Sequence, residues 1–176
     1  HKTRLTMEVV ENALTRGDAV LAYQPIVQAD RPSLSAFHEG LIRIIDDSGR
    51  FVPLRDFMPG AETTELGRRI DCASIALGLH ALQQDSGLRL SVNMSARSIG
   101  HPVWMETLRR GIARDERIAE RLILEVTESS AMDMPEVVIP FMHDLQGRGA
   151  SFALDDFGAG HTSFRYLREF NFDMIK

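Results

Sequence analysis

Two adjacent carboxylates, Asp155 and Asp156, end a short apolar stretch, and a glycine-spaced loop follows them within residues 151–163, SFALDDFGAGHTS. Side chains alternate along a strand, so Ser151, Ala153 and Asp155 share one face, and the small residues leave space beside the carboxylate. Neighbouring carboxylates repel each other unless a cation or a proton lies between them. An isolated pair is more simply interpreted as a helix cap and a solvated turn. Three earlier segments favour the cation site, because they place similar side chains at similar points.

Those earlier segments are strand-like runs at 35–45, 89–95 and 122–128. Except for one lysine, all of the candidate side chains carry oxygen, which suits hard cations such as Mg²⁺ or Mn²⁺ better than a structural zinc. The carboxylates are numerous enough for two ions, which would clamp the attacking and leaving oxygens of a phosphoryl centre. Arg43, on the Glu39 face, would offer a charged fork to a phosphate. The candidates are Glu39, Asn93, Glu125, Glu128, Asp155, Asp156 and Lys176.

Alternating strand and helix patterns must position these residues. Apolar spacing and turn residues predict helices at 5–16, 53–57, 69–84, 102–114, 135–146 and 162–170. The predicted strands are 20–28, 35–45, 89–95, 122–128, the run that starts at Ser151, and 172–176. Pro25 places the first strand at an edge or a bulge, because proline donates no ladder hydrogen bond.

This alternation predicts an α/β fold with parallel βαβ units. A (β/α)₈ barrel gathers its active site from the C-terminal ends of several strands, which matches the candidate positions. A doubly wound open sheet is the alternative, but no glycine-rich phosphate loop follows the first strand.

The composition is that of one globular domain, residues 1–176, with 44% hydrophobic and 26% charged residues. A net charge of −5 argues against a nucleic-acid polymer as the partner. Cys72 is the single cysteine, and no apolar run is long enough to span a bilayer. We therefore expect a cytoplasmic domain with no membrane segment.

Five motifs, FHEGLIRI, SVNMS, LEVTE, DDFGAGHTS and FDMIK, occur in an order and spacing that resemble the EAL-domain family of cyclic di-GMP phosphodiesterases. YQPIV and FMPGAETTEL match the family too, so the resemblance covers essentially the whole chain. It implies a modified (β/α)₈ TIM-type barrel with an antiparallel first strand. It also implies hydrolysis of one phosphodiester of cyclic di-GMP to the linear dinucleotide, with Mg²⁺ or Mn²⁺ as cofactor.

The resemblance also implies roles, position by position. Glu39 matches the signature glutamate, a metal ligand, and Arg43 the arginine that contacts a substrate phosphate. Lys176 matches a lysine near the metal-activated water, so Glu39, Asp156 and Lys176 form the implied catalytic set. Glu128 matches a glutamate that holds the loop after the fifth strand. The implied metal ligands are Glu39, Asn93, Glu125, Asp155 and Asp156, and the implied substrate-binding residues are Gln24, Leu41 and Arg43.

The chain departs from the family pattern at three places. Gly40 replaces the usual alanine of the signature triplet, where we expect added backbone freedom and not lost chemistry, and His161 replaces a common tyrosine. The family continues past the lysine with an acidic residue and two further strands that bear another metal-binding glutamate. We therefore expect a barrel without its last strands, belonging to a longer polypeptide with further signalling domains. Alone, it should be poorly soluble or oligomeric and inactive, with no strand to fix Lys176.

Three functions remain open at this point: a metal-dependent cyclic di-GMP phosphodiesterase, a catalytically silent receptor or protein-interaction module of the same fold, and another metallohydrolase. Silent members usually lose metal ligands, and none is lost in the part of the domain that this chain covers. The loop 157–162 is expected to be mobile and coupled to the site, with Glu128 as its tether. In the family this loop links dimerisation to metal binding, so we also expect a homodimer.

Overall fold

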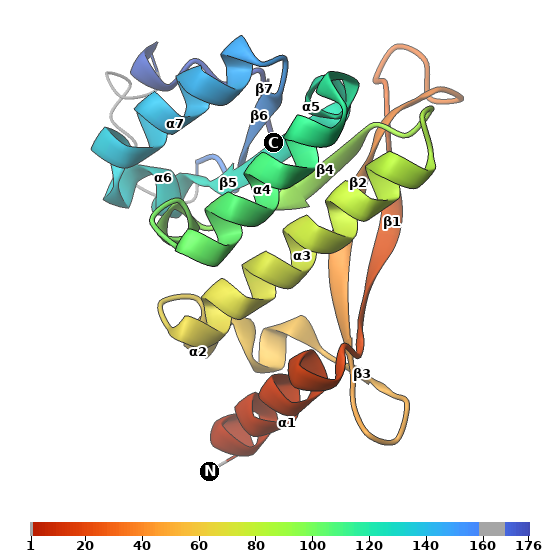
Figure 1. Cartoon of the computed structure of the whole chain (residues 1–176), viewed down its shortest axis with the longest axis vertical. Coiled ribbons are helices and arrows are strands. Elements are labelled where there is room, and N and C mark those ends of the chain that lie inside the picture. Colours follow the sequence, from red (N-terminus) through yellow and green to blue (C-terminus); the bar gives the residue numbers. More distant parts are fainter. Residues whose placement is uncertain (1, 159–167) are drawn as a thin grey trace.

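The computed structural model describes residues 2–158 and 168–176, and its strands form one twisted sheet (Figure 1). The strand order is β1-β2-β4-β5-β6-β7, and β3 pairs with β2 beside this path. β1 runs antiparallel to β2, and every pairing from β2 through β4, β5 and β6 to β7 is parallel. The predicted parallel βαβ units and the antiparallel first strand are thus confirmed. The strands are β1 (Ala19–Val27), β2 (Ser35–Ile45), β3 (Phe51–Val52), β4 (Leu90–Asn93), β5 (Leu122–Thr127), β6 (Ser151–Asp155) and β7 (Met174–Ile175).

Helices α3, α4 and α7 lie across one face of this sheet, and α1 lies near the β2–β3 hairpin (Figure 1). The helices are α1 (Lys2–Arg16), α2 (Met58–Ala61), α3 (Glu65–Gln84), α4 (Pro102–Arg114), α5 (Glu116–Arg121), α6 (Glu128–Asp133) and α7 (Pro135–Gly147), with 3₁₀ turns at Leu54–Asp56 and Ala96–Ser98. No described helix is both long and apolar enough to cross a membrane.

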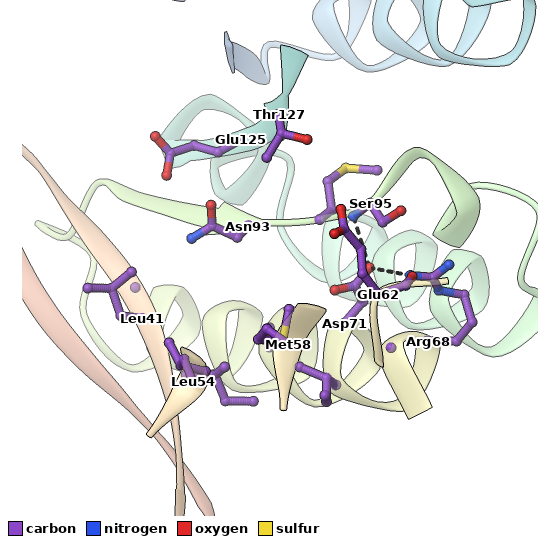
Figure 2. A pocket seen from close by; sticks show the side chains of 16 residues that line it. Leu41, Leu54, Met58, Glu62, Arg68, Asp71, Asn93, Ser95, Glu125 and Thr127 are labelled. Atoms are coloured by element: carbon purple, nitrogen blue, oxygen red, sulfur yellow. Dashed lines mark hydrogen bonds and ion pairs between the residues drawn. The ribbon is translucent and has the colours of Figure 1, made fainter. Parts of the chain in front are cut away.

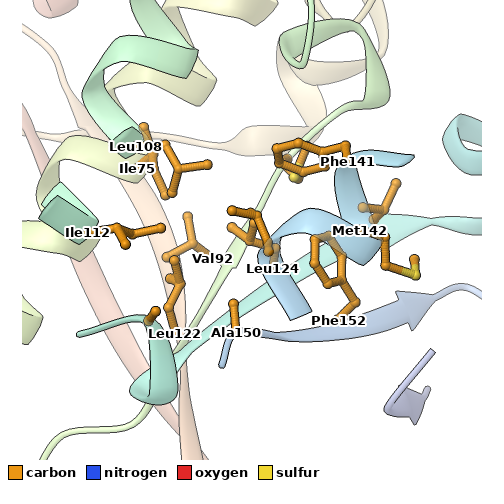
Figure 3. Close-up of a cluster of buried hydrophobic side chains, with 14 of the residues drawn as sticks. Ile75, Val92, Leu108, Ile112, Leu122, Leu124, Phe141, Met142, Ala150 and Phe152 are labelled. Carbon is orange, nitrogen blue, oxygen red and sulfur yellow. The ribbon is translucent and has the colours of Figure 1, made fainter. Parts of the chain in front are cut away.

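The main core fills the space between the sheet and these helices (Figure 3). Val92, Leu124 and Phe152 point outward from three adjacent strands and are almost wholly buried. Phe141 of α7 meets the Phe152 ring edge-on, with 5.8 Å between the ring centroids. Each such side chain contributes roughly 1.5–3 kcal/mol on burial, so this face holds the strands in place.

The opposite face of the sheet has a much smaller apolar cluster made by Phe37, Ile123 and Ala153. Because side chains alternate along a strand, Glu39 and Glu125 follow on this same face, two residues nearer the C-terminal ends of their strands. Hydrophobic residues thus close the base of this face, while acidic residues occupy its C-terminal end.

β1 is an edge strand, as Pro25 predicts. Pro25 pairs with His38, and the register shifts between Ile26 and Val27. α1 ends at Arg16, and Gly17 follows with φ +79°, a conformation that glycine adopts without strain.

Several predicted boundaries are wrong: α1 begins three residues early, at Lys2, and β4 and β7 are shorter than predicted. α3 begins at Glu65, four residues before the predicted start, and its first turn already buries Leu66, one helical turn before Ile70. Pro53 precedes the 3₁₀ turn Leu54–Asp56 and is not its first residue. β5 ends at Thr127, whose side chain accepts a hydrogen bond from the Ser130 amide, so Glu128 begins α6 and does not end a strand. The predicted helix 162–170 and His161 lie largely or wholly outside the described residues.

The C-terminal strand corrects another expectation, that Lys176 has no strand to fix it. The Lys176 amide donates to the Leu154 carbonyl at 2.8 Å, and its carbonyl accepts from the Phe157 amide at 3.2 Å. β7 therefore fixes the Lys176 backbone against β6.

Candidate active site

Strand register brings the predicted site residues to one end of one face. Glu39 pairs with Ser91, and Asn93 pairs with Glu125 two residues further along. Glu125 in turn pairs with Ala153, which pairs with Met174, two residues before Lys176. Paired residues point to the same side of a sheet, so Glu39, Asn93, Glu125 and Lys176 lie on one face of the sheet between β2 and β7.

Lys176 joins the two glutamates. Its Nζ donates to Glu39 Oε2 at 3.1 Å and to Glu125 Oε1 at 2.7 Å, and Asn93 donates to the Glu39 carboxylate. The Glu125 side chain is fully buried, and its Oε2 has no hydrogen-bond partner among the described residues. Two carboxylates thus share one ammonium group, which leaves an excess of negative charge and an unpartnered oxygen.

Burial and the neighbouring Glu39 charge raise the pKa of Glu125 to about 7, although Lys176 opposes this rise. Burial alone would raise the pKa of Glu39 as well, but hydrogen bonds from Glu125, Lys176 and Asn93 outweigh it and lower that pKa. Burial would lower the pKa of Lys176, yet its bonds to the two glutamates raise it. Near neutral pH the two carboxylates therefore hold one proton between them for much of the time.

The oxygen atoms of this cluster are the kind of ligand that a hard divalent cation prefers. Their side chains do not, however, enclose a position for the ion. The cluster consists of carboxylate and amide oxygens, one of them buried and unpartnered, and it carries surplus negative charge once Glu125 is ionised. Within residues 2–158 and 168–176, however, no three Asp, Glu, His or Cys side chains are close enough to enclose a metal ion. The Lys176 ammonium lies against both carboxylates instead.

Asp155 explains the open cluster and corrects one expectation. It lies on the Glu125 face, opposite Thr127, but its Oδ1 accepts a hydrogen bond from the Asp156 amide at 2.9 Å. No contact joins it to Glu39 or Glu125 among the described residues. The predicted convergence therefore holds for Glu39, Asn93 and Glu125, and not for Asp155 in this arrangement. Asp156 is exposed and has φ +56°, and among the described residues no hydrogen bond or ion pair joins its side chain to the cluster.

Glu128 contacts the loop that follows β6, as the tether hypothesis requires. Its Oε2 accepts from the Gly158 amide at 2.8 Å, while its Oε1 is buried without a partner among the described residues. The bond fixes the first residues after Asp156. The rest of the predicted mobile loop, 159–162, lies outside the described residues, so its mobility stays a prediction.

The three predicted substrate-binding residues lie along β1 and β2. Gln24 is exposed and pairs directly with Glu39, so the two share a face. Leu41 lines a cavity together with Asn93 and Glu125. Arg43 lies two residues further along β2 and donates through Nη1 to the Ile42 carbonyl at 3.1 Å. Gly40 faces the other way, where an added methyl group would lie 3.2–3.3 Å from Ser91, Leu21 and Leu90, so close packing also suits glycine here.

The cavity beside the carboxylates has a volume of about 190 Å³ (Figure 2). It runs from Asn93 and Glu125 toward the start of α3, and Leu54 and Met58 supply apolar wall. Its far end is lined by polar side chains that sequence reasoning missed, Glu62, Arg68 and Asp71. One feature of the sequence could have revealed these polar residues. Arg68 and Asp71 are charged, although the stretch around them otherwise predicts a buried helix face.

Asp71 anchors a buried hydrogen-bond network behind this cavity. Its Oδ2 accepts from the Ser95 amide at 2.9 Å and from the Ser98 hydroxyl at 2.5 Å. Ser130 of α6 continues the network, because its Oγ accepts from the Ala96 amide at 2.8 Å. Burial raises the pKa of Asp71, although the bonds from Ser98 and Ser95 oppose the rise. The network fixes the turn after Asn93 against α3 and α6.

The fold and these motifs are those of a known family. The EAL domain family model matches residues 7–176, so the chain belongs to the EAL domain family. It is 31% identical to the cyclic di-GMP phosphodiesterase PdeB of Shewanella oneidensis over 175 residues, which are 95% of this chain and 20% of that protein. It is also 31% identical to the bifunctional diguanylate cyclase/cyclic di-GMP phosphodiesterase MucR of Pseudomonas aeruginosa, over 90% of this chain and 24% of that protein. The chain thus spans about a fifth to a quarter of the length of these relatives.

Solved structures agree on the fold. The PaMucR phosphodiesterase in complex with c-di-GMP superposes with a TM-score of 0.77 at 27% identity, covering 97% of this chain and 71% of that one. The FimX EAL domain of Xanthomonas citri, also in complex with c-di-GMP, has a TM-score of 0.82 at 24% identity, covering 98% of this chain and 68% of that one. The architecture is therefore the TIM-like EAL barrel, as far as this chain extends through it.

Proposed function

We propose that this chain belongs to the phosphodiesterase domain of a signalling protein, and that this protein hydrolyses cyclic di-GMP to the linear dinucleotide. One observation carries the proposal: Glu39, Asn93, Glu125 and Lys176 meet at the C-terminal ends of strands β2, β4, β5 and β7, and Asn93 and Glu125 line a cavity there. Active sites of barrel enzymes occupy this end. The names of the relatives supply the substrate class.

Glu39, Asn93 and Glu125 would hold a divalent cation, Mg²⁺ or Mn²⁺, with Asp155 and Asp156 completing one or two sites. The bound cation supplies an activated water and neutralises charge on the phosphoryl oxygens. Cation binding requires an ionised Glu125, so its shared proton leaves to solvent. Asp155, whose Oδ1 accepts from the Asp156 amide in this structure, would be the third carboxylate ligand. Lys176, which donates to both glutamates, would hold a proton and balance their charge.

Substrate positioning falls to β1 and β2. Arg43 would hold a phosphate through its guanidinium, Gln24 would contact the nucleotide beside Glu39, and Leu41 would supply apolar contact at the cavity rim. The register that places Gln24 opposite Glu39 supports this division of roles. Glu128 keeps the loop after Asp156 near the site through Gly158.

A silent cyclic di-GMP receptor is the second candidate, and one observation favours it: Asp155 bonds to its own neighbour, which leaves the described carboxylate cluster open. Such a protein would bind the dinucleotide in the same cavity without cleaving it.

One experiment separates these functions. The full-length protein is incubated with cyclic di-GMP in Mg²⁺, in Mn²⁺ or with a chelator, and the products are separated by chromatography while binding is measured by calorimetry. Metal-dependent formation of the linear dinucleotide, abolished in Glu39→Gln, supports the phosphodiesterase. Binding without cleavage supports the receptor. Cleavage of other phosphodiesters in preference to cyclic di-GMP would favour another metallohydrolase, and neither binding nor cleavage would overturn the proposal.

We further propose that the domain acts in the cytoplasm and as a homodimer within a multidomain protein. With a single cysteine, Cys72, the chain can form no internal disulfide, so nothing in it calls for an oxidising compartment. The relatives' greater length supports additional domains.

A further inference from the structure

Arg68 is a buried cation that the proposed chemistry does not use. It lies in the first turns of α3, is only 7% exposed, and lines the end of the cavity farthest from Glu125 (Figure 2). Arginine is rarely buried without a full set of partners. Its position therefore calls for an explanation.

The described residues satisfy Arg68 only in part. Its Nη2 donates to the Glu62 carbonyl at 3.0 Å and lies 3.6 Å from Asp71 Oδ2. That Asp71 oxygen already accepts two shorter bonds from Ser95 and Ser98. The buried Arg68 Nε has no partner among the described residues. Leaving a buried donor without a partner costs free energy. This guanidinium can therefore donate a further hydrogen bond to an acceptor in the cavity.

The residues that line the cavity restrict which kind of chemical group could carry that acceptor. Leu54, Met58 and Ile70 line the space, and this combination of apolar wall and few polar groups suits an aromatic ring system. A phosphate is disfavoured because Glu62 and Asp71 also line the cavity and would repel it. The same cavity reaches Asn93 and Glu125, so a ligand that inserts a base toward Arg68 keeps its backbone beside the carboxylates.

We propose that Arg68 reads a guanine base of the dinucleotide by donating to the O6 and N7 acceptors on its Hoogsteen edge. Guanine offers two acceptors there, and a bidentate arginine is the commonest partner of that edge. Adenine has an amino group in place of O6, and this donor would face another donor on Arg68. Arg68 is thus a specificity-determining residue, an inference that rests on the proposed function.

The test compares ligand discrimination in three proteins: the unmutated protein, Arg68→Met and the control Arg69→Met. The control is matched because the adjacent Arg69 points elsewhere, its Nη2 donating to Thr15 Oγ1 at 3.0 Å. Affinities for cyclic di-GMP and cyclic di-AMP are measured by calorimetry with chelator present, which prevents metal-dependent turnover. The preference for guanine should fall about 5- to 150-fold in Arg68→Met, the size of a bidentate arginine–base contact, and should persist in Arg69→Met.

A second measurement needs no variant, so it stands even if Arg68→Met fails to fold. A cyclic dinucleotide of 7-deazaguanosine, which lacks N7, should bind the unmutated protein at least several-fold more weakly than cyclic di-GMP. Equal affinity for this analogue, or an unchanged guanine preference in a folded Arg68→Met, would overturn the role of Arg68 while leaving the proposed function intact. Failure of the unmutated protein to bind cyclic di-GMP at all would overturn both.

Discussion

Replacement of Glu125 by glutamine should stabilise the metal-free protein while removing its proposed function. Burial and Glu39 raise the pKa of Glu125 from 4.5 to about 7, so the folded state holds a proton that the unfolded state has lost. The stability linked to this proton is fully present below pH 4.5 and is lost as the pH rises through 7. Glutamine is neutral at every pH, has nearly the same shape, and keeps an oxygen for Lys176 and a donor for Glu39.

The size of the Glu125 pKa shift determines how much the free energy of unfolding should change. At about 1.4 kcal/mol per pKa unit, an ionised Glu125 costs the fold about 3 kcal/mol at pH 8 and almost nothing at pH 4. Glu125→Gln should therefore raise the free energy of unfolding by about 2–3 kcal/mol at pH 8 and by much less at pH 5. Urea denaturation at both pH values, with chelator present, measures the difference.

The control is Glu106→Gln, a surface glutamate 55% exposed and paired with Arg110. Its free energy of unfolding should change by less than about 1 kcal/mol at either pH. Mg²⁺ or Mn²⁺ should stabilise the unmutated protein and Glu106→Gln, but not Glu125→Gln. If Glu125→Gln is no more stable than the unmutated protein at pH 8, the electrostatic account of this cluster is refuted.

Three further variants test neighbouring parts of the site. Arg43→Ala should weaken cyclic di-GMP binding at least about tenfold in calorimetry while leaving Mn²⁺ affinity unchanged, because a charged hydrogen bond to phosphate is worth about 1.5–3 kcal/mol; metal loss with normal binding would reverse its assignment. Lys176→Met should lower the free energy of unfolding more at pH 8 than at pH 5, since the remaining carboxylates must then take up a proton, and equal losses would contradict this. Glu128→Ala should speed hydrogen exchange at the Gly158 amide and lower activity, and an unchanged exchange rate would remove Glu128 as tether.

Sequence patterns predicted the sheet better than the short elements. β2 and α4 match their predicted bounds, because alternating or helical apolar spacing is strong over their whole length. α5 and α6 have only one or two turns, too few for such periodicity, so neither was predicted. Their ends depend instead on caps such as Asp115, whose side chain accepts from the Arg117 amide.

Strand alternation predicts which face of the sheet a residue occupies, and only this part of the site could be predicted from the sequence. Alternation placed Glu39, Asn93 and Glu125 on one face, and the structure brings them together around Lys176. It gives no side-chain rotamer, so it could not predict that Asp155 bonds to the next amide. Nor could it predict Arg68 at the cavity, since that position depends on how α3 packs against the turn before it.

The central claim is that Glu39, Asn93 and Glu125 form a divalent-cation site, and Mn²⁺ titration followed by electron paramagnetic resonance tests it most directly. At pH 8 the unmutated protein should bind Mn²⁺ and lose free-ion signal, whereas Glu39→Gln should bind at least tenfold more weakly while its circular dichroism spectrum stays unchanged. Equal Mn²⁺ affinity in a folded Glu39→Gln would contradict the account.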